Sequence, residues 1–371
     1  MREASDFFAA VKPGSHSDQF KVLMALYCLK ADQEAVETKS VKNFLKLHFG
    51  TKIPANIGTC LRRYKAYVQV QPGPPLRWSL TNPGVAKLRE ITGLALVADT
   101  TDHYLTDIGI VCALDHPEFS AVVDATGGIG QWRDIGNPKY PHLYRACEIT
   151  ADSGEKLKVV ATTSTSMGLT AASIVTTQLI MQYRPKIVVM IGIAAGTRDG
   201  NKQFGDVLIA DPSVDYNSGK VVIADGVRDF LPDPYPIGLN PRVRSLLHKY
   251  KGNHSIFDSI REGWSGKVPP SRNHLYVGPL GAADQVIDDA TRVLEIQRNW
   301  RKLIGVEMET YGVYRACYEA PEPKPRMVSI KAVCDFAAEK SDSWQAFAAY
   351  VAAQFAIRFF KAEWQALWPP K

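Results

Sequence analysis

Carboxylate side chains stand at two points where the sequence predicts that a strand has just ended. Asp335 directly follows the β-rich run 327–333, and Glu307 and Glu309 flank Met308 in an otherwise apolar context. Ligands of open α/β sheets collect at the carboxyl ends of strands, where such groups can act as acids or bases. Two plainer interpretations remain open: a helix cap for Asp335, and a solvated first helical turn for the glutamates.

Small residues mark two further points of the same kind. The segment 167–172 reads MGLTAA, and the segment 191–196 reads IGIAAG and includes Ala194 and Gly196. Small side chains let a ligand approach the backbone closely, and amides at the start of a helix suit anions or sugar oxygens. Tight packing of a strand against a helix is the alternative explanation.

The elements that must position these residues alternate between strand and helix. Short apolar runs predict buried strands, and longer periodic segments predict helices, which together indicate an α/β domain with a mixed, mostly parallel sheet. The predicted strands are 107–114, 158–164, 186–193, 206–210 and 327–333, and the predicted helices are 170–183, 291–298, 306–319 and 343–360.

The N-terminal part follows a different pattern. Three helical segments precede a strand–turn–strand unit and a short helix, an order that resembles a winged-helix domain. The helices are predicted at 16–31, 38–49, 53–64 and 84–91, and the strands at 66–70 and 76–80. With 93–105 as a linker, we expect a small α+β domain at 1–95 and a larger domain at 105–371.

Positive charge is concentrated in the first part of the 371-residue chain. Residues 1–99 contain 14 Lys and Arg against 8 Asp and Glu, which accounts for the whole net charge of +6. Arg62, Arg63 and Lys65 lie near the end of the third predicted helix, where a winged helix would contact nucleic acid. A protein-binding role, with the basic residues as a solvated face, is an equal alternative, and a module that senses a signal and controls assembly is a third.

Taken in order, the motifs of the larger part resemble the purine nucleoside phosphorylase and nucleosidase superfamily, and most closely its 5'-methylthioadenosine/S-adenosylhomocysteine nucleosidases. The resemblance covers about 105–362. It rests on Ala113-Leu114 with Glu118, the stretch 168–196, Gly205-Asp206-Val207, the segment 281–286, Val306-Glu307-Met308-Glu309, Cys334-Asp335-Phe336 and the tail 344–350. It implies a three-layer nucleoside phosphorylase-like domain with a central mixed sheet.

The resemblance assigns three chemical roles. Asp335 matches the acid that protonates the leaving purine, most usefully at N7. Glu309 matches the carboxylate that grips the ribose hydroxyls and stabilises an oxocarbenium-like sugar, with Met308 packing under the ring. Glu118 matches the residue that holds and deprotonates the attacking water, with a solvated residue at a helix start as the alternative.

Other positions match the substrate pocket of the family. Val286 and Ile287 fall where the family lines the base pocket, although no aromatic ring is present here to stack on the base. The resemblance also places Glu307, Ala194, Gly196 and Phe336 against the substrate.

The chain departs from the family at several points. Ala282-Ala283 replaces a usual Ser-Gly pair, and Ile193 replaces a small or hydroxyl residue. The segment 114–118 lacks the Gly-Asp-Pro and Arg pattern with which phosphorylases bind inorganic phosphate, which favours water as the acceptor.

We therefore expect a purine nucleosidase, a hydrolase that cleaves the N-glycosidic bond of a purine nucleoside or nucleotide to free base and ribosyl product. We expect adenine as the base and the N-terminal part as the regulator of the enzyme. The tail resembles a subgroup that accompanies signalling or defence modules, so a defence or stress response is part of this hypothesis. A purine nucleoside phosphorylase and a nucleoside-sensing DNA-binding regulator are the alternatives.

Few other partners are expected. The six cysteines are scattered without a CxxC pair or a His/Cys cluster, so we expect reduced thiols in a cytoplasm, with no metal and no cofactor. No stretch reaches 18 uncharged apolar residues, so no membrane association is expected. We also expect a homo-oligomer, a dimer or higher.

Overall fold

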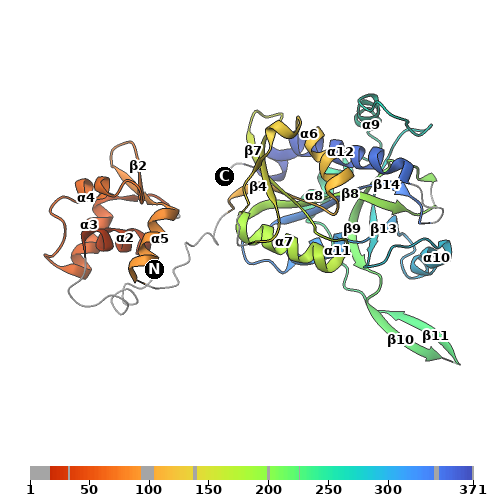
Figure 1. Cartoon of the computed structure of the whole chain (residues 1–371), viewed down its shortest axis with the longest axis horizontal. Coiled ribbons are helices and arrows are strands. Elements are labelled where there is room, and N and C mark those ends of the chain that lie inside the picture. Colours follow the sequence, from red (N-terminus) through yellow and green to blue (C-terminus); the bar gives the residue numbers. More distant parts are fainter. Residues whose placement is uncertain are drawn as a thin grey trace. The chain divides into compact units, whose positions relative to one another are not determined.

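The chain forms two compact units, residues Met1–His103 and Tyr104–Lys371, in a computed structural model (Figure 1). The structure describes residues 17–31, 34–92, 104–136, 140–198, 201–224, 226–337 and 342–369. Most of the expected linker, 93–103, lies outside the described residues.

The first unit is a small α+β domain around one apolar core. Its elements are α2 (Asp18–Cys28), β1 (Val36–Glu37), α3 (Thr38–Phe49), α4 (Ile57–Arg63), β2 (Val68–Gln71), β3 (Arg77–Leu80) and α5 (Asn82–Thr92). The strands form an antiparallel sheet in the order β1-β3-β2, and Trp78 of the central strand is buried. The predicted helix 38–49 is confirmed, whereas α4 begins later than predicted because Asn56 caps it, accepting a hydrogen bond from the Thr59 amide.

A nine-stranded mixed sheet organises the second unit, in the order β13-β12-β9-β14-β8-β4-β7-β6-β5. The strands are β4 (Thr106–Cys112), β5 (Arg133–Asp134), β6 (Tyr144–Thr150), β7 (Lys156–Thr163), β8 (Pro185–Gly196), β9 (Val207–Asp215), β12 (Leu275–Ala282), β13 (Gly305–Glu307) and β14 (Arg326–Asp335). The central strands are almost wholly buried, as expected for parallel strands covered on both faces.

One end of this sheet closes on itself. β13 pairs in parallel with β12 and antiparallel with β8, where Val306 lies opposite Ala195. The strands β8, β14, β9, β12 and β13 therefore form a closed ring, in which β9 runs antiparallel to β14 and β13 runs antiparallel to β8.

Helices cover both faces of the sheet, which gives the three-layer α/β fold predicted from the family resemblance (Figure 1). One apolar cluster joins the sheet to α7 (Leu169–Tyr183) and α11 (Thr310–Tyr318). Another joins it to α6 (Ser120–Ala125), α8 (Pro241–His248), α9 (His254–Glu262) and the long α12 (Gln345–Leu367).

Two features differ from the sequence-based prediction. Val306 and Glu307 belong to strand β13, not to a helix, and the helix begins only at Thr310, because these residues pair with β8 and β12. The hairpin of β10 (Gly219–Ala224) and β11 (Val227–Pro232) has no counterpart in the predicted elements. The predicted helix 291–298 is confirmed as α10 (Ala290–Asn299).

Two negative observations apply to the described part of the chain. None of its helices is both long enough and apolar enough to cross a membrane. All six cysteines are buried and unpaired with one another.

Candidate active site

A cavity of about 170 Å³ opens near the carboxyl ends of β4, β8, β12, β13 and β14. It is lined by Ala113, Leu114, Glu118, Met167, Ile193, Ala194, Ala195, Gln285, Val286, Ile287, Val306, Glu307, Met308, Glu309, Cys334, Asp335 and Gln345. Of the ten residues that the sequence places at the site, the structure brings eight together here: Asp335, Glu118, Glu309, Met308, Glu307, Ala194, Val286 and Ile287.

Asp335 reaches the cavity because β14 is irregular at its end. Val333 lies opposite Ala194 and Asp335 lies opposite Ala195, so Cys334 is an extra residue of the kind that makes a bulge and re-aims a side chain. Oδ1 of Asp335 accepts a hydrogen bond from the Ala337 amide at 2.8 Å. Its Oδ2 lies 3.4 Å from the Cys334 thiol and is the oxygen with capacity left for a ligand.

Glu118 is a buried anchor and not a solvated residue at a helix start, with a relative exposure of only 1%. Its Oε2 accepts hydrogen bonds from the amides of Ala113 and Leu114, and its Oε1 accepts one from Ile193 at 2.9 Å. Gly192 allows this approach, because a Cβ at that position would collide with the carboxylate. Three amide donors thus hold one carboxylate against the cavity.

A buried lysine joins two of the glutamates. Nζ of Lys331 lies 3.2 Å from Oε2 of Glu307 and 3.4 Å from Oε2 of Glu309, and all three residues are buried. The oxygens of Glu307 also accept hydrogen bonds from the amides of Glu309 and Thr310, which begin α11. Glu307 therefore orients the start of α11, although it also lines the cavity.

Glu309 connects two distant parts of the chain. Its Oε1 accepts a hydrogen bond from the Gly168 amide at 3.1 Å, and the next amide, of Leu169, donates to Asp284. Gly168 has a φ of +115°, which favours glycine, and it caps α7. The small-residue segment 167–172 thus supplies the backbone amides that bind the carboxylates of Glu309 and Asp284.

The charges of this cluster do not balance. Burial raises the pKa of Glu118 and of Glu307, while the nearby Lys331 lowers both pKa values. Burial by itself lowers the pKa of Lys331, but Glu307, Glu118 and Glu309 together raise it above its ordinary value. One ammonium therefore faces three carboxyl groups, and an additional positive charge in the cavity would be stabilised.

The loop after β12 forms the other wall. Ile287 is buried among apolar residues, whereas Val286 is 60% exposed at the rim. Gln285 and Gln345 add polar groups at this side of the cavity.

Two predicted site residues, Gly196 and Phe336, do not line this cavity. Gly196 ends β8, and a Cβ there would press on Val333 and on the ring of Phe336. Phe336 packs edge-on against Phe204 with ring centroids 5.3 Å apart. Both residues therefore pack at the ends of β8 and β14.

The sequence-based prediction missed Lys331, Gln345 and Met167. Lys331 could have been recognised, because it is a lone charge in the apolar run 328–334, and such a residue needs a buried partner. Gln345 comes from a distant segment and has no local signal, whereas Met167 begins the small-residue segment 167–172 that the sequence marks as a place where a ligand can approach the backbone. Within the described residues, no group of three or more His, Cys, Asp or Glu side chains is arranged to hold a metal ion.

The chain is similar in sequence to known proteins. A Sinorhizobium fredii protein, y4jS, is 31% identical over 252 residues, which are 68% of this chain and 60% of that protein. The ATP nucleosidase Cap17 of Escherichia coli is 25% identical over 211 residues, 54% of this chain and 40% of the relative. The chain therefore spans less than two thirds of the length of either relative.

The fold has a solved counterpart. The 5'-methylthioadenosine/S-adenosylhomocysteine nucleosidase of Helicobacter pylori superposes with a TM-score of 0.53 at 18% identity, over 69% of this chain and 98% of that one. The sequence profile described as Phosphorylase superfamily matches residues 107–362, which include every strand end that lines the cavity. By this match, and by the fold that carries the acidic site, the chain belongs to the phosphorylase superfamily.

Proposed function

We propose that this protein hydrolyses the N-glycosidic bond of an adenine nucleoside or nucleotide. The observation that carries the proposal is the buried cluster of Glu118, Glu307 and Glu309 around the single Lys331, across a cavity from Asp335. Base departure leaves positive charge on the sugar, and a preorganised excess of negative charge stabilises it. The named activities of two similar proteins, an ATP nucleosidase and a 5'-methylthioadenosine/S-adenosylhomocysteine nucleosidase, support adenine as the base.

The reaction assigns one task to each carboxyl group. The bond between C1' and N9 breaks, its electron pair goes to the base, and Asp335 gives a proton to N7. Glu309 holds the ribose hydroxyls with Oε2, while its Oε1 stays on the Gly168 amide. Water then attacks C1', and its proton goes to Glu118, whose raised pKa makes it a better base than an exposed glutamate.

The hydrogen bonds and charges of the site favour water over inorganic phosphate as the group that attacks the sugar. The amides of Gly168 and Leu169 at the start of α7, which would suit an anion, instead donate to Glu309 and Asp284. A phosphate dianion in this cavity would also meet the carboxylates of Glu118 and Glu309. We therefore infer hydrolysis and not phosphorolysis.

To test the proposal, the protein is incubated with adenosine, AMP, ATP or methylthioadenosine, each with and without inorganic phosphate. The adenine released is measured by chromatography. Phosphate-independent release is expected. Release that requires phosphate would make the protein a phosphorylase, and no release from any member of the panel would contradict the proposal.

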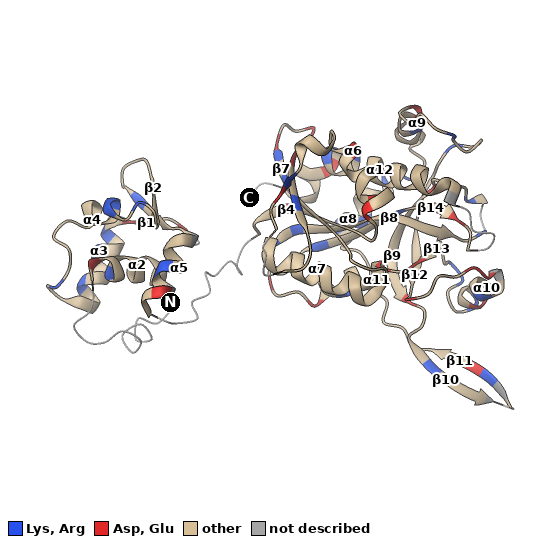
Figure 2. Ribbon diagram, in the orientation of Figure 1, with Lys and Arg blue, Asp and Glu red and all other residues tan. Residues whose placement is uncertain are grey.

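For the first unit we infer a binding role that regulates the enzyme, with nucleic acid as the ligand to test. Lys and Arg residues recur on its helices (Figure 2). Lys39, Lys42 and Lys46 of α3 are exposed, as are Arg62 and Arg63 at the end of α4. Exposed cations on two neighbouring helices suit a phosphate backbone.

A further inference from the structure

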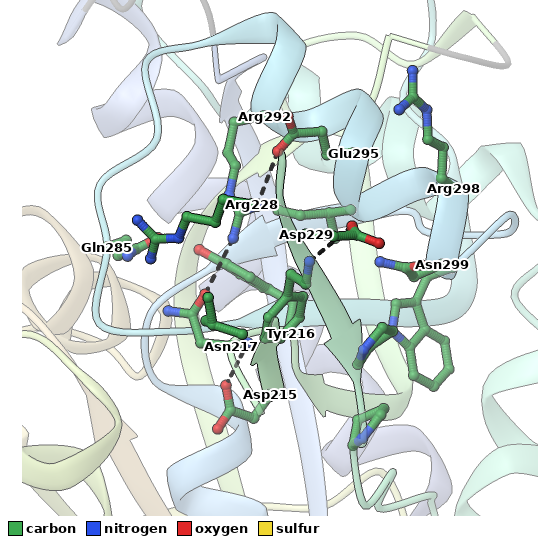
Figure 3. A pocket seen from close by; sticks show the side chains of 16 residues that line it. Asp215, Tyr216, Asn217, Arg228, Asp229, Gln285, Arg292, Glu295, Arg298 and Asn299 are labelled. Atoms are coloured by element: carbon green, nitrogen blue, oxygen red, sulfur yellow. Dashed lines mark hydrogen bonds and ion pairs between the residues drawn. The ribbon is translucent and has the colours of Figure 1, made fainter. Parts of the chain in front are cut away.

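A second cavity, of about 680 Å³, borders the first, and Gln285 lines both. Its walls come from the end of β9, the β10–β11 hairpin and α10 (Figure 3). This volume is within the usual range for sites that bind small molecules. Apart from Gln285, none of its lining residues lines the acidic cavity.

Three arginines line this second cavity: Arg228 from β11, and Arg292 and Arg298 from α10. Arg292 is held in place, because it contacts Glu295 at 3.0 Å and donates to Asn217 at 3.4 Å. Figure 3 shows the Arg228 side chain extending from the hairpin toward Arg292 and Gln285. Two guanidinium groups therefore point into one space.

Three acidic residues line the same cavity, and within the described residues none of them forms an ion pair with Arg228 or Arg298. Asp215 accepts a hydrogen bond from the Asn217 amide at 2.9 Å, and Asp229 accepts one from the Phe230 amide at 2.8 Å. Glu295 pairs with Arg292. Within the described part of the chain, Arg228 has no ion-pair partner, so the cavity keeps a cation available for a ligand.

We propose that this cavity binds the phosphate chain of a nucleotide. Guanidinium groups bind phosphate oxygens through paired hydrogen bonds, and the amide side chains of Asn217, Asn299 and Gln285 can donate further ones. The choice of a nucleotide rests on the proposed function. The phosphates belong either to the substrate itself, reaching across Gln285, or to a separate nucleotide that regulates the enzyme.

Binding of inorganic triphosphate to the full-length protein tests the site without relying on catalysis. Calorimetry should show binding to the wild type and a loss of about tenfold or more in affinity for Arg228→Gln, because one charge-assisted contact is removed. Arg133→Gln is the matched control, since Arg133 is exposed on β5 and lines neither cavity, and it should bind like the wild type. A wild type that does not bind triphosphate, or an Arg228→Gln variant that binds as well, would overturn the proposal.

Kinetics then distinguish the two sources of phosphate. If the phosphates are those of the substrate, triphosphate competes with ATP, and Arg228→Gln raises the KM for ATP more than the KM for adenosine. If a separate nucleotide binds, triphosphate instead changes the kcat for adenosine. Base release from adenosine without triphosphate binding would overturn this inference alone, whereas triphosphate binding without any base release would overturn only the proposed hydrolase activity.

Discussion

Nζ of Lys331 lies 3.2 Å from Oε2 of Glu307, and the side chains of both residues are at most 2% exposed. This pair connects β14 to the strand β13 that closes the ring. Since Glu307 also holds the first amides of α11, the pair orients Glu309 and thereby the wall of the cavity.

Removal of the lysine charge should destabilise the protein. Lys331→Met leaves buried carboxylates without their cation, and breaking a buried ion pair of this kind removes about 3–5 kcal/mol from the free energy of unfolding. Urea denaturation measures the change. Lys156→Met, at an exposed position of β7, should leave the midpoint nearly unchanged. Equal midpoints for both variants would show that the buried pair adds nothing to stability.

The acid should be needed for base release. Asp335→Asn keeps the side-chain shape but removes the proton donor, so the rate should fall by about 10²-fold or more. Asp124→Asn, at an exposed position of α6, is the control for loss of a carboxyl group. Both variants should unfold like the wild type, and near-normal turnover by Asp335→Asn would remove Asp335 from the mechanism.

The pH dependence of kcat/KM should reflect the ionisation of Glu118. Burial raises its pKa above the ordinary value of 4.5, and the water-activating form is the ionised one. As the pH falls through this raised pKa, Glu118 takes up a proton and kcat/KM should decline, at a higher pH than for an exposed glutamate. An acid limb at or below 4.5, or one that persists in Glu118→Gln, would contradict this assignment.

Glu309 should bind the ribose of the substrate and should not be needed to bind the base. Glu309→Gln keeps the size of the side chain but weakens its grip on the ribose hydroxyls, so base release should fall while free adenine still binds. Calorimetry with adenine and chromatographic rate measurements separate the two effects. A parallel loss of adenine binding would instead indicate that Glu309 only maintains the link to Gly168.

The first unit should bind duplex DNA in a salt-dependent manner. Each contact of Lys or Arg with phosphate releases a counterion, and the slope of log affinity against log salt changes by about 0.9 for each contact. The double variant Arg62→Ala with Arg63→Ala should flatten that slope by roughly 2. Fluorescence anisotropy of a labelled duplex at several salt concentrations measures it. No binding at low salt would favour a protein partner or control of assembly.

Local patterns in the sequence were enough to predict much of the fold. The helix 38–49 agrees with α3, and the apolar runs 186–193 and 327–333 lie within β8 and β14, because burial on both faces leaves a continuous apolar signal. The carboxyl residues Glu118, Glu309 and Asp335 could be singled out because their order along the chain resembles that of a family with the same fold.

Other features depend on contacts between distant segments. Val306 and Glu307 have a helical pattern, yet they form a strand because β8 and β12 offer free backbone partners there. The burial of Glu118 follows from the amide of Ile193, 75 residues later in the chain. The second cavity, which Arg228, Arg292 and Arg298 line, forms only where the β10–β11 hairpin and α10 come together near Asn217. The spacing of residues in the sequence indicates only local periodicity. Which strand ends pair, and which charged residues from distant segments meet, depends on how the closed sheet brings those segments together.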